Sequence, residues 1–121
     1  MKMDPDLMRK ILKAYETLPE ERVWEEISIL GCKQSGIRYH EKLLADRKFI
    51  EIESEGNVAD DHTTIIPIRL TFAGHEFLEQ ARNDTNWNKA KSIIVEKGLP
   101  MTIDVLSSIL GKIIAQALGL P

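Results

Sequence analysis

The middle of the chain changes from a helical to a strand-like spacing of its apolar side chains, and this change constrains the fold more than any other feature. Residues 35–48 carry apolar side chains about every 3.6 positions, which predicts an amphipathic helix. Residues 49–54 and 63–70 alternate apolar with polar side chains, which predicts two strands. The polar stretch 55–62 then joins the two strands into a hairpin. The apolar face of the helix comprises Ile37, His40, Leu43, Leu44 and Arg47.

Two segments near this hairpin depart from a simple pattern. Pro67 has no backbone N–H, so the second strand should lie at an edge of the sheet or contain a bulge. Residues 22–30 fit either a strand or a short helix. We favour a strand, because Ile27 and Ile29 alternate and Gly31 follows them.

Helical segments flank the hairpin region on both sides. An amphipathic helix is predicted after the N-terminus, another after the hairpin, a third around Trp87, and an apolar one at the C-terminus that ends at about residue 118. Trp87 is expected to be a buried anchor. The expected starts and stops of these helices are marked by Pro5, Pro19, Thr71, Asp84, Gly98, Pro100 and Thr102.

The resulting order of helix, strand, helix, hairpin and helix predicts an α+β fold of winged-helix type. We expect a winged-helix-like domain over residues 1–100. Residues 101–121 form an apolar C-terminal helical arm, packed on the body or used in oligomerisation. Two features depart from a standard helix-turn-helix. The stretch before Gly31 is too strand-like to supply the middle helix, and Gly36 weakens the helix that begins there.

Four stretches of the sequence resemble one known family. They read DLMRKIL at 6–12, YHEKLL at 39–44, LTFAGHEFL at 70–78 and NDTNWNKAK at 83–91. On these motifs the chain resembles the family called domain of unknown function 2513, over nearly its whole length. The resemblance implies a winged-helix-like fold and a setting in bacteria and their phages, and it implies no activity.

The polar face of the helix at 35–48 is the candidate site for nucleic acid. Side chains there can contact phosphates or base edges, and the charge of the segment is locally positive. We therefore expect a non-enzymatic binding protein that acts as a winged-helix regulator of transcription on double-stranded DNA, and the family resemblance implies that it is of phage or prophage type. The candidate DNA-binding residues are Lys33, Gln34, Ser35, Arg38, Tyr39 and Lys42.

The acidity of the hairpin and of the whole chain supports an alternative. The formal net charge is −3, whereas non-specific nucleic-acid binders are usually basic. Acidic side chains also crowd the hairpin with no Lys or Arg between them, and they would repel phosphates. The alternative is a protein–protein interaction module that binds or antagonises a host protein without binding DNA. The acidic residues are Glu51, Glu53, Glu55, Asp60 and Asp61.

The sequence contains no recognisable catalytic or metal-binding motif. It lacks a phosphate-binding glycine loop, a nucleophile-elbow motif and paired cysteines, and Cys32 is its only cysteine. The local cluster at 60–62 is better explained as solvated loop residues than as metal ligands. We therefore expect no enzyme activity, no cofactor and no metal. A cytoplasmic location is expected, without membrane association.

The C-terminal helix predicts self-association. Its apolar residues are spaced alternately three and four positions apart, which is the pattern of a helix that packs along a seam. A helix this apolar at a chain end must be covered, either by a second copy or by the chain itself. We expect a homo-oligomer, with a dimer favoured. The candidate residues are Ile103, Leu106, Ile109, Leu110, Ile113, Ile114 and Ala117.

Overall fold

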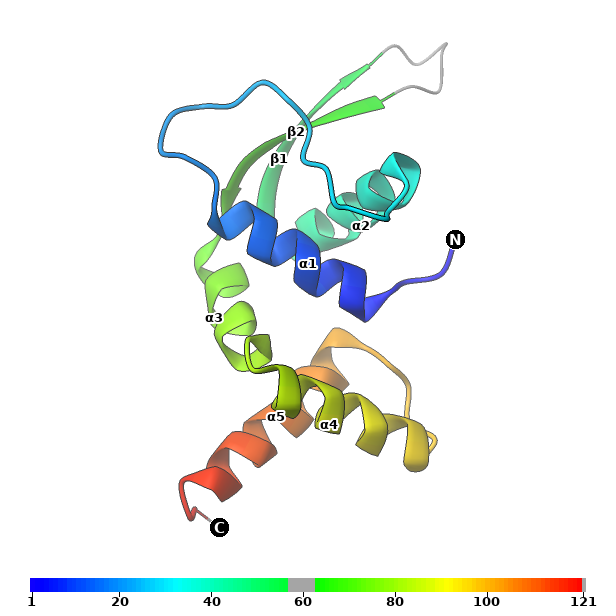
Figure 1. Ribbon diagram of the computed structural model, residues 1–121, viewed down its shortest axis with the longest axis vertical. Helices are drawn as coiled ribbons and strands as arrows, with labels where there is room; N and C mark the ends of the chain where they lie inside the picture. Colours follow the sequence, from blue (N-terminus) through cyan, green and yellow to red (C-terminus); the bar gives the residue numbers. More distant parts are fainter. Residues whose placement is uncertain (57–62, 121) are drawn as a thin grey trace. The chain divides into compact units, whose positions relative to one another are not determined.

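In the computed structural model, which describes residues 1–56 and 63–120, the chain folds into helices and one antiparallel hairpin (Figure 1). This confirms the predicted α+β class. The chain divides into two compact units, Met1–His75 and Glu76–Pro121. The division falls inside a helix, α3 (Phe72–Ala81). The tip of the hairpin, including Asp60, Asp61 and His62, lies outside the described residues.

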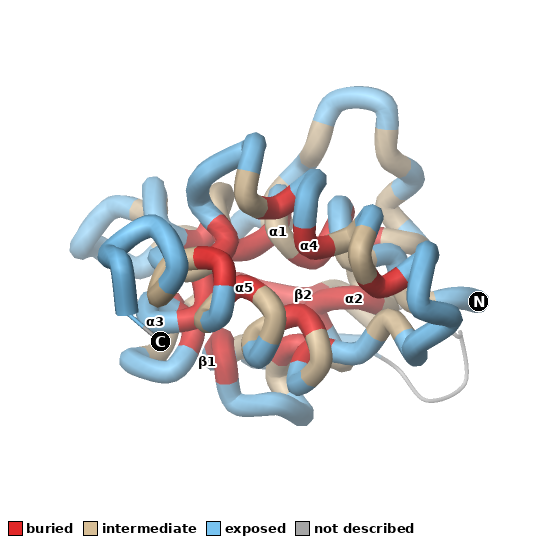
Figure 2. The backbone as a smooth tube through the Cα atoms, turned by 90° about the horizontal axis from the view of Figure 1, so that it is seen from below, coloured by how far each residue is buried: buried red, intermediate tan, exposed pale blue. Residues whose placement is uncertain are grey.

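The first unit is built from two helices packed on the hairpin. Helix α1 (Pro5–Glu16) contacts α2 (Gln34–Asp46) and strand β2 (Thr63–Leu70), and α2 also contacts β1 (Ile50–Gly56). Helix α1 begins where the carboxylate of Asp4 accepts the backbone N–H groups of Asp6 and Leu7. Figure 2 shows buried stretches in α1, α2 and β2. The apolar face of α1 that is buried comprises Leu7, Met8, Ile11, Leu12 and Tyr15.

The hairpin confirms the expectation for Pro67. The two strands pair antiparallel, and the register shifts between Glu51, which pairs with Arg69, and Ile52, which pairs with Pro67. Ile68 is therefore the extra residue of an irregularity next to the proline. A residue without an N–H is tolerated there because the regular ladder is already interrupted.

The strand favoured for residues 22–30 is wrong. Those residues contain no helix or strand and cross the first unit as an irregular segment (Figure 1). The N–H of Ile65 on β2 donates to the side-chain carboxylate of Glu26, at 2.8 Å. The carbonyl of Ile27 accepts from the side chain of Gln34, at 3.1 Å. Because side chains satisfy these backbone groups, the segment does not continue the sheet as a third strand.

The second unit contains helices α4 (Asp84–Glu96) and α5 (Ile103–Ala117), which pack against each other. Trp87 is buried, as predicted, and meets Phe77 edge to face with ring centroids 6.5 Å apart. The cap of α4 is Asn83, which accepts from the N–H of Asn86, so the predicted cap at Asp84 is one residue too late. Thr102 caps α5 as predicted, and Gly98 ends α4 with a φ of +65°.

Among the described residues, no helix combines the length and the apolar character needed to cross a membrane.

Candidate nucleic-acid interface

Four of the six candidate DNA-binding residues meet around one hollow on the surface of α2. The hollow has a volume of about 270 Å³. Its lining includes one guanidinium, one lysine ammonium and three hydroxyl groups, which are all groups that bind phosphate oxygens. Among the described residues, no acidic side chain lines it. The lining residues are Met1, Ser35, Arg38, Tyr39, Lys42 and Thr63.

The N-terminus of α2 adds to the positive character of this face. The residue at the N-cap position is Lys33, and its side chain makes no capping hydrogen bond. Backbone N–H groups in a first helical turn lack partners within the helix and carry partial positive charge. Ser35 lies in that turn and also lines the hollow. An anion at the hollow would therefore lie near a helix end that favours negative charge.

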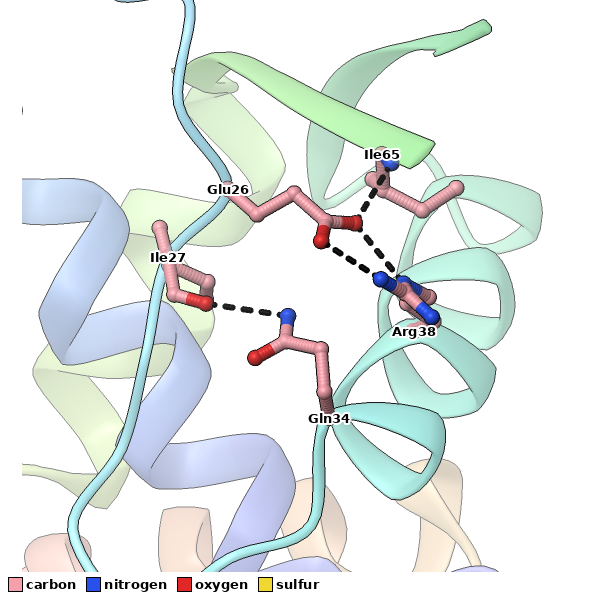
Figure 3. A network of polar contacts seen from close by, with 5 residues as sticks. All are labelled: Glu26, Ile27, Gln34, Arg38 and Ile65. Atoms are coloured by element: carbon pink, nitrogen blue, oxygen red, sulfur yellow. Dashed lines mark hydrogen bonds and ion pairs between the residues drawn. The ribbon is translucent and has the colours of Figure 1, made fainter. Parts of the chain in front are cut away.

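Arg38 is held by the protein itself. Its guanidinium donates two hydrogen bonds to the carboxylate of Glu26, with N–O distances of 2.8 and 2.7 Å (Figure 3). The same carboxylate accepts the N–H of Ile65, so it lies between α2 and β2. Hydrogen bonds from Arg38 hold the pKa of Glu26 below its ordinary value of 4.5. Arg38 therefore anchors the irregular segment, and its charge is largely compensated.

The remaining candidates divide into anchored and exposed residues. Gln34 is half-buried and donates a hydrogen bond from its side-chain amide to the carbonyl of Ile27, as Figure 3 shows. Lys33 and Lys42 are exposed, and neither side chain makes a hydrogen bond or ion pair among the described residues. Tyr39 is half-buried and meets His40 edge to face. The two lysines are therefore the cations of this face that are available to an external anion.

The acidic strand is partly neutralised by ion pairs that the sequence did not indicate. Glu51 accepts from Arg69 on the neighbouring strand, with an N–O distance of 2.6 Å. Glu53 pairs with Arg22 from the irregular segment. These contacts lower the negative charge that the hairpin would present to a phosphate backbone. Glu55 is exposed.

A buried carboxylate, which the sequence analysis missed, lies on the side of α2 that contacts α1. The side chain of Glu41 is fully buried and accepts a hydrogen bond from the hydroxyl of Tyr15 on α1. Its other oxygen, Oε1, has no hydrogen-bond partner among the described residues. Burial raises the pKa of Glu41 to about 7, and burial also raises the pKa of Tyr15 above its ordinary value. The sequence spacing could have indicated this burial, because Glu41 follows Ile37 by four residues and precedes Leu44 by three, which places it beside the apolar face of the helix.

The neighbouring histidine, His40, has a structural role in the same interface. Its Nε2 atom accepts the backbone N–H of Asp4 at 2.7 Å, and Nδ1 lies 2.8 Å from the carbonyl oxygen of Gly36. A neutral ring with its proton on Nδ1 satisfies both contacts. His40 thus joins the start of α1 to the first turn of α2. Among the described residues, no group of three or more His, Cys, Asp or Glu side chains could hold a metal ion.

The candidate oligomerisation residues fall into two groups in the folded chain. Ile103, Leu106, Leu110 and Ile113 are buried within the single chain. Ile109 and Ile114 are half-buried, and Ala117 is exposed. The seam is thus largely covered by the chain's own core, so only its flank is open to a second copy. Dimerisation through α5 stays a prediction.

Comparison with known proteins places the chain in a family. The family model described as "Hypothetical protein (DUF2513)" matches residues 2–100. A protein of Haemophilus influenzae described as "Uncharacterized protein" is 34% identical over 124 residues, which cover 98% of this chain and 100% of that protein.

The chain belongs to the DUF2513 family. The resemblance expected from the sequence motifs is therefore confirmed. The DUF2513 match includes α1 to α4 and ends before α5 begins, whereas the relative's match extends over nearly the whole chain. No solved structure matches the chain.

Proposed function

We propose that this DUF2513 protein is a non-enzymatic DNA-binding regulator of phage or prophage type. In this proposal the first unit is a winged-helix-like module, and α2 is the helix that approaches double-stranded DNA. The observation that carries the proposal is the hollow on α2, where Ser35, Tyr39 and Lys42 meet beside an uncapped helix start. Helix N-termini and hydroxyl, ammonium and guanidinium groups are the usual contacts to DNA phosphates.

The ion pairs of the hairpin weaken the main electrostatic objection to this proposal. A strand that carried three unpaired glutamates beside the DNA would repel it. Arg69 and Arg22 compensate two of them, Glu51 and Glu53. The exposed lysines of α2 then determine the local field near the hollow, even though the formal net charge is −3.

The exposed lysines allow a test that leaves the fold intact. We expect the double variant Lys33→Gln, Lys42→Gln to bind duplex DNA roughly tenfold more weakly at low salt. The slope of log affinity against log salt concentration should become less negative by about 2, because two phosphate contacts are lost. Fluorescence anisotropy with labelled genomic fragments at four salt concentrations measures both quantities. The melting temperature should be unchanged, since neither side chain has an internal partner.

A charge-matched control separates local contact from general attraction. The variant Lys97→Gln, Lys112→Gln removes two exposed lysines of the second unit. It should leave DNA affinity within about twofold of the original protein. Equal weakening by the two double variants would refute a contact at α2, and so would no binding of the unmodified protein at micromolar concentration in low salt. Arg38 is unsuitable for this test, because its replacement would also break the contact with Glu26.

A second candidate function is favoured by the irregular segment. Trp24 is 64% exposed, and the guanidinium of Arg22 lies 4.2 Å from the centroid of its ring. Leu30 is fully exposed on the same segment. Exposed tryptophan and arginine side chains are frequent anchors of protein interfaces. This supports the alternative, a module that binds a host protein.

The variant Trp24→Ala tests this alternative. It is expected to lose a host protein that the unmodified chain recovers from lysate under the same conditions, and to keep its affinity for DNA. The loss should correspond to about 2 kcal/mol or more of binding free energy, because a tryptophan anchor is removed. Quantitative pull-down with Phe72→Ala as control measures it, since Phe72 is another exposed aromatic residue. Recovery of the same partner by Trp24→Ala would exclude this surface.

A further inference from the structure

A second hollow lies in the second unit, between α4 and α5. It has a volume of about 240 Å³. Its apolar lining comes from both helices and from the turn that follows α4. Leu99 of that turn is 43% exposed although it is a large apolar residue. The apolar residues of the lining are Ile93, Leu99, Ile109 and Ile113.

Three lysines also line this hollow, and no acidic side chain of the described residues does. Lys89 and Lys97 come from α4 and its C-cap, and Lys112 comes from α5. All three are exposed, and none has a side-chain hydrogen bond or ion pair among the described residues. A polar side chain, Gln116, completes the lining. The hollow therefore combines an apolar interior with uncompensated positive charge at its rim.

Positive charge is concentrated at this hollow, although the second unit has no formal net charge as a whole. Residues 76–121 contain five basic and five acidic residues, and three of the five basic ones line this single hollow. Of the other two, Arg82 pairs with Glu79 and the ammonium of Lys91 lies 5.9 Å from the centroid of the Trp87 ring. The three rim lysines thus differ from the rest in having no internal partner.

We propose that this hollow binds a single-chain aliphatic carboxylate, with the hydrocarbon tail against the isoleucines and Leu99 and the carboxylate among the lysines. The volume of the hollow favours a ligand with a single hydrocarbon chain over a bulkier one, because drug-sized ligands occupy larger pockets of about 300 to 1,000 Å³. The positive charge of the three lysines favours a ligand with an anionic head group. The site is separate from the α2 face and goes beyond the proposed role in DNA binding.

Titration of the full chain with sodium decanoate, below its micellar concentration, tests the proposal. We expect saturable binding in isothermal titration calorimetry. In two-dimensional amide NMR spectra, the shifts should concentrate on residues 89–99 and 109–116. Decyltrimethylammonium has a tail of the same length with the opposite charge and should not bind. Hexaglutamate, which is anionic without a tail, should bind at least tenfold more weakly than decanoate.

Two variants test whether decanoate binds at this hollow. Lys97→Gln, Lys112→Gln should weaken decanoate binding about fivefold to tenfold, because two exposed ion pairs are lost. Leu99→Ser should weaken it by reducing the apolar contact. Lys33→Gln, Lys42→Gln serves as the charge-matched control and should leave it unchanged, so failure here and failure of the DNA proposal are distinguishable. Equal binding of decyltrimethylammonium or hexaglutamate, no binding of decanoate, or equal weakening by the control variant would overturn the proposal.

Discussion

Replacing Gly74 with alanine is expected to destabilise the protein by at least about 3 kcal/mol. A Cβ atom at this position would lie 2.1 Å from the carbonyl oxygen of Phe49 and 2.7 Å from Cδ1 of Leu70. The carbonyl cannot move away freely, because it accepts the N–H of Thr71 at 2.9 Å. The contact is where α3 begins against the end of the hairpin, so relief would require the helix start to shift.

Chemical denaturation of Gly74→Ala, followed by circular dichroism, measures this loss. Gly111→Ala is the matched control, since it also adds one methyl group to a helical glycine. Its Cβ would lie 3.9 Å from the nearest atom, Nε2 of Gln80, which is an ordinary contact. The free energy of unfolding of the control should equal that of the original protein or exceed it by up to about 1 kcal/mol, because alanine favours the helix. A Gly74→Ala protein as stable as the control would show that α3 does not approach Phe49 this closely.

Raising the pH from 5 to 8 is expected to weaken the fold by about 2 to 3 kcal/mol through Glu41 alone. Burial raises the pKa of this carboxyl from 4.5 to about 7 in the folded chain, and the unfolded chain has the ordinary value. The folded state therefore binds the proton more tightly. The contribution of Glu41 to the free energy of unfolding is fully present below pH 4.5 and is lost as the pH rises through about 7.

Glu41→Gln isolates this contribution, because glutamine keeps a carbonyl oxygen for the hydroxyl of Tyr15 and does not titrate. The difference in unfolding free energy between the variant and the original protein should move by 2 to 3 kcal/mol in favour of the variant between pH 5 and 8. Urea denaturation at half-unit pH steps measures it. The charged groups near Glu41, Arg38 on the same helix and Glu26 on the irregular segment, are common to both proteins and cancel in the difference. A difference that is independent of pH would contradict a buried, neutral Glu41.

The elements that the sequence predicted correctly are those with a strong local signal. The hairpin was predicted from alternating side chains. Its irregularity was predicted from Pro67, because a residue without an N–H cannot donate to a regular ladder whatever the strand packs against. Thr102 and Gly98 marked a helix start and a helix end through bonds within a few residues. The motifs of residues 6–12, 39–44, 70–78 and 83–91 also sufficed to indicate the family.

Only some features of the candidate site could be predicted from the sequence. The helical period correctly placed Lys42 on the exposed face of α2, since exposure along a helix depends on spacing alone. It could not show that Arg38 is paired, because its partner Glu26 is 12 residues away on an irregular segment. The alternation of Ile27 and Ile29 likewise indicated a strand, whereas the contacts that hold this segment are made by the side chains of Glu26 and Gln34.

The sequence by itself therefore determined the helices, the hairpin, their order and the family, because each depends on residues that are neighbours in the chain. Only the tertiary structure decided which charges remain available. It neutralised Arg38 and two glutamates of β1, buried Glu41 against Tyr15, and left Lys33 and Lys42 exposed. The physical reason is that pairing and desolvation depend on distances between elements, which spacing along one element does not encode.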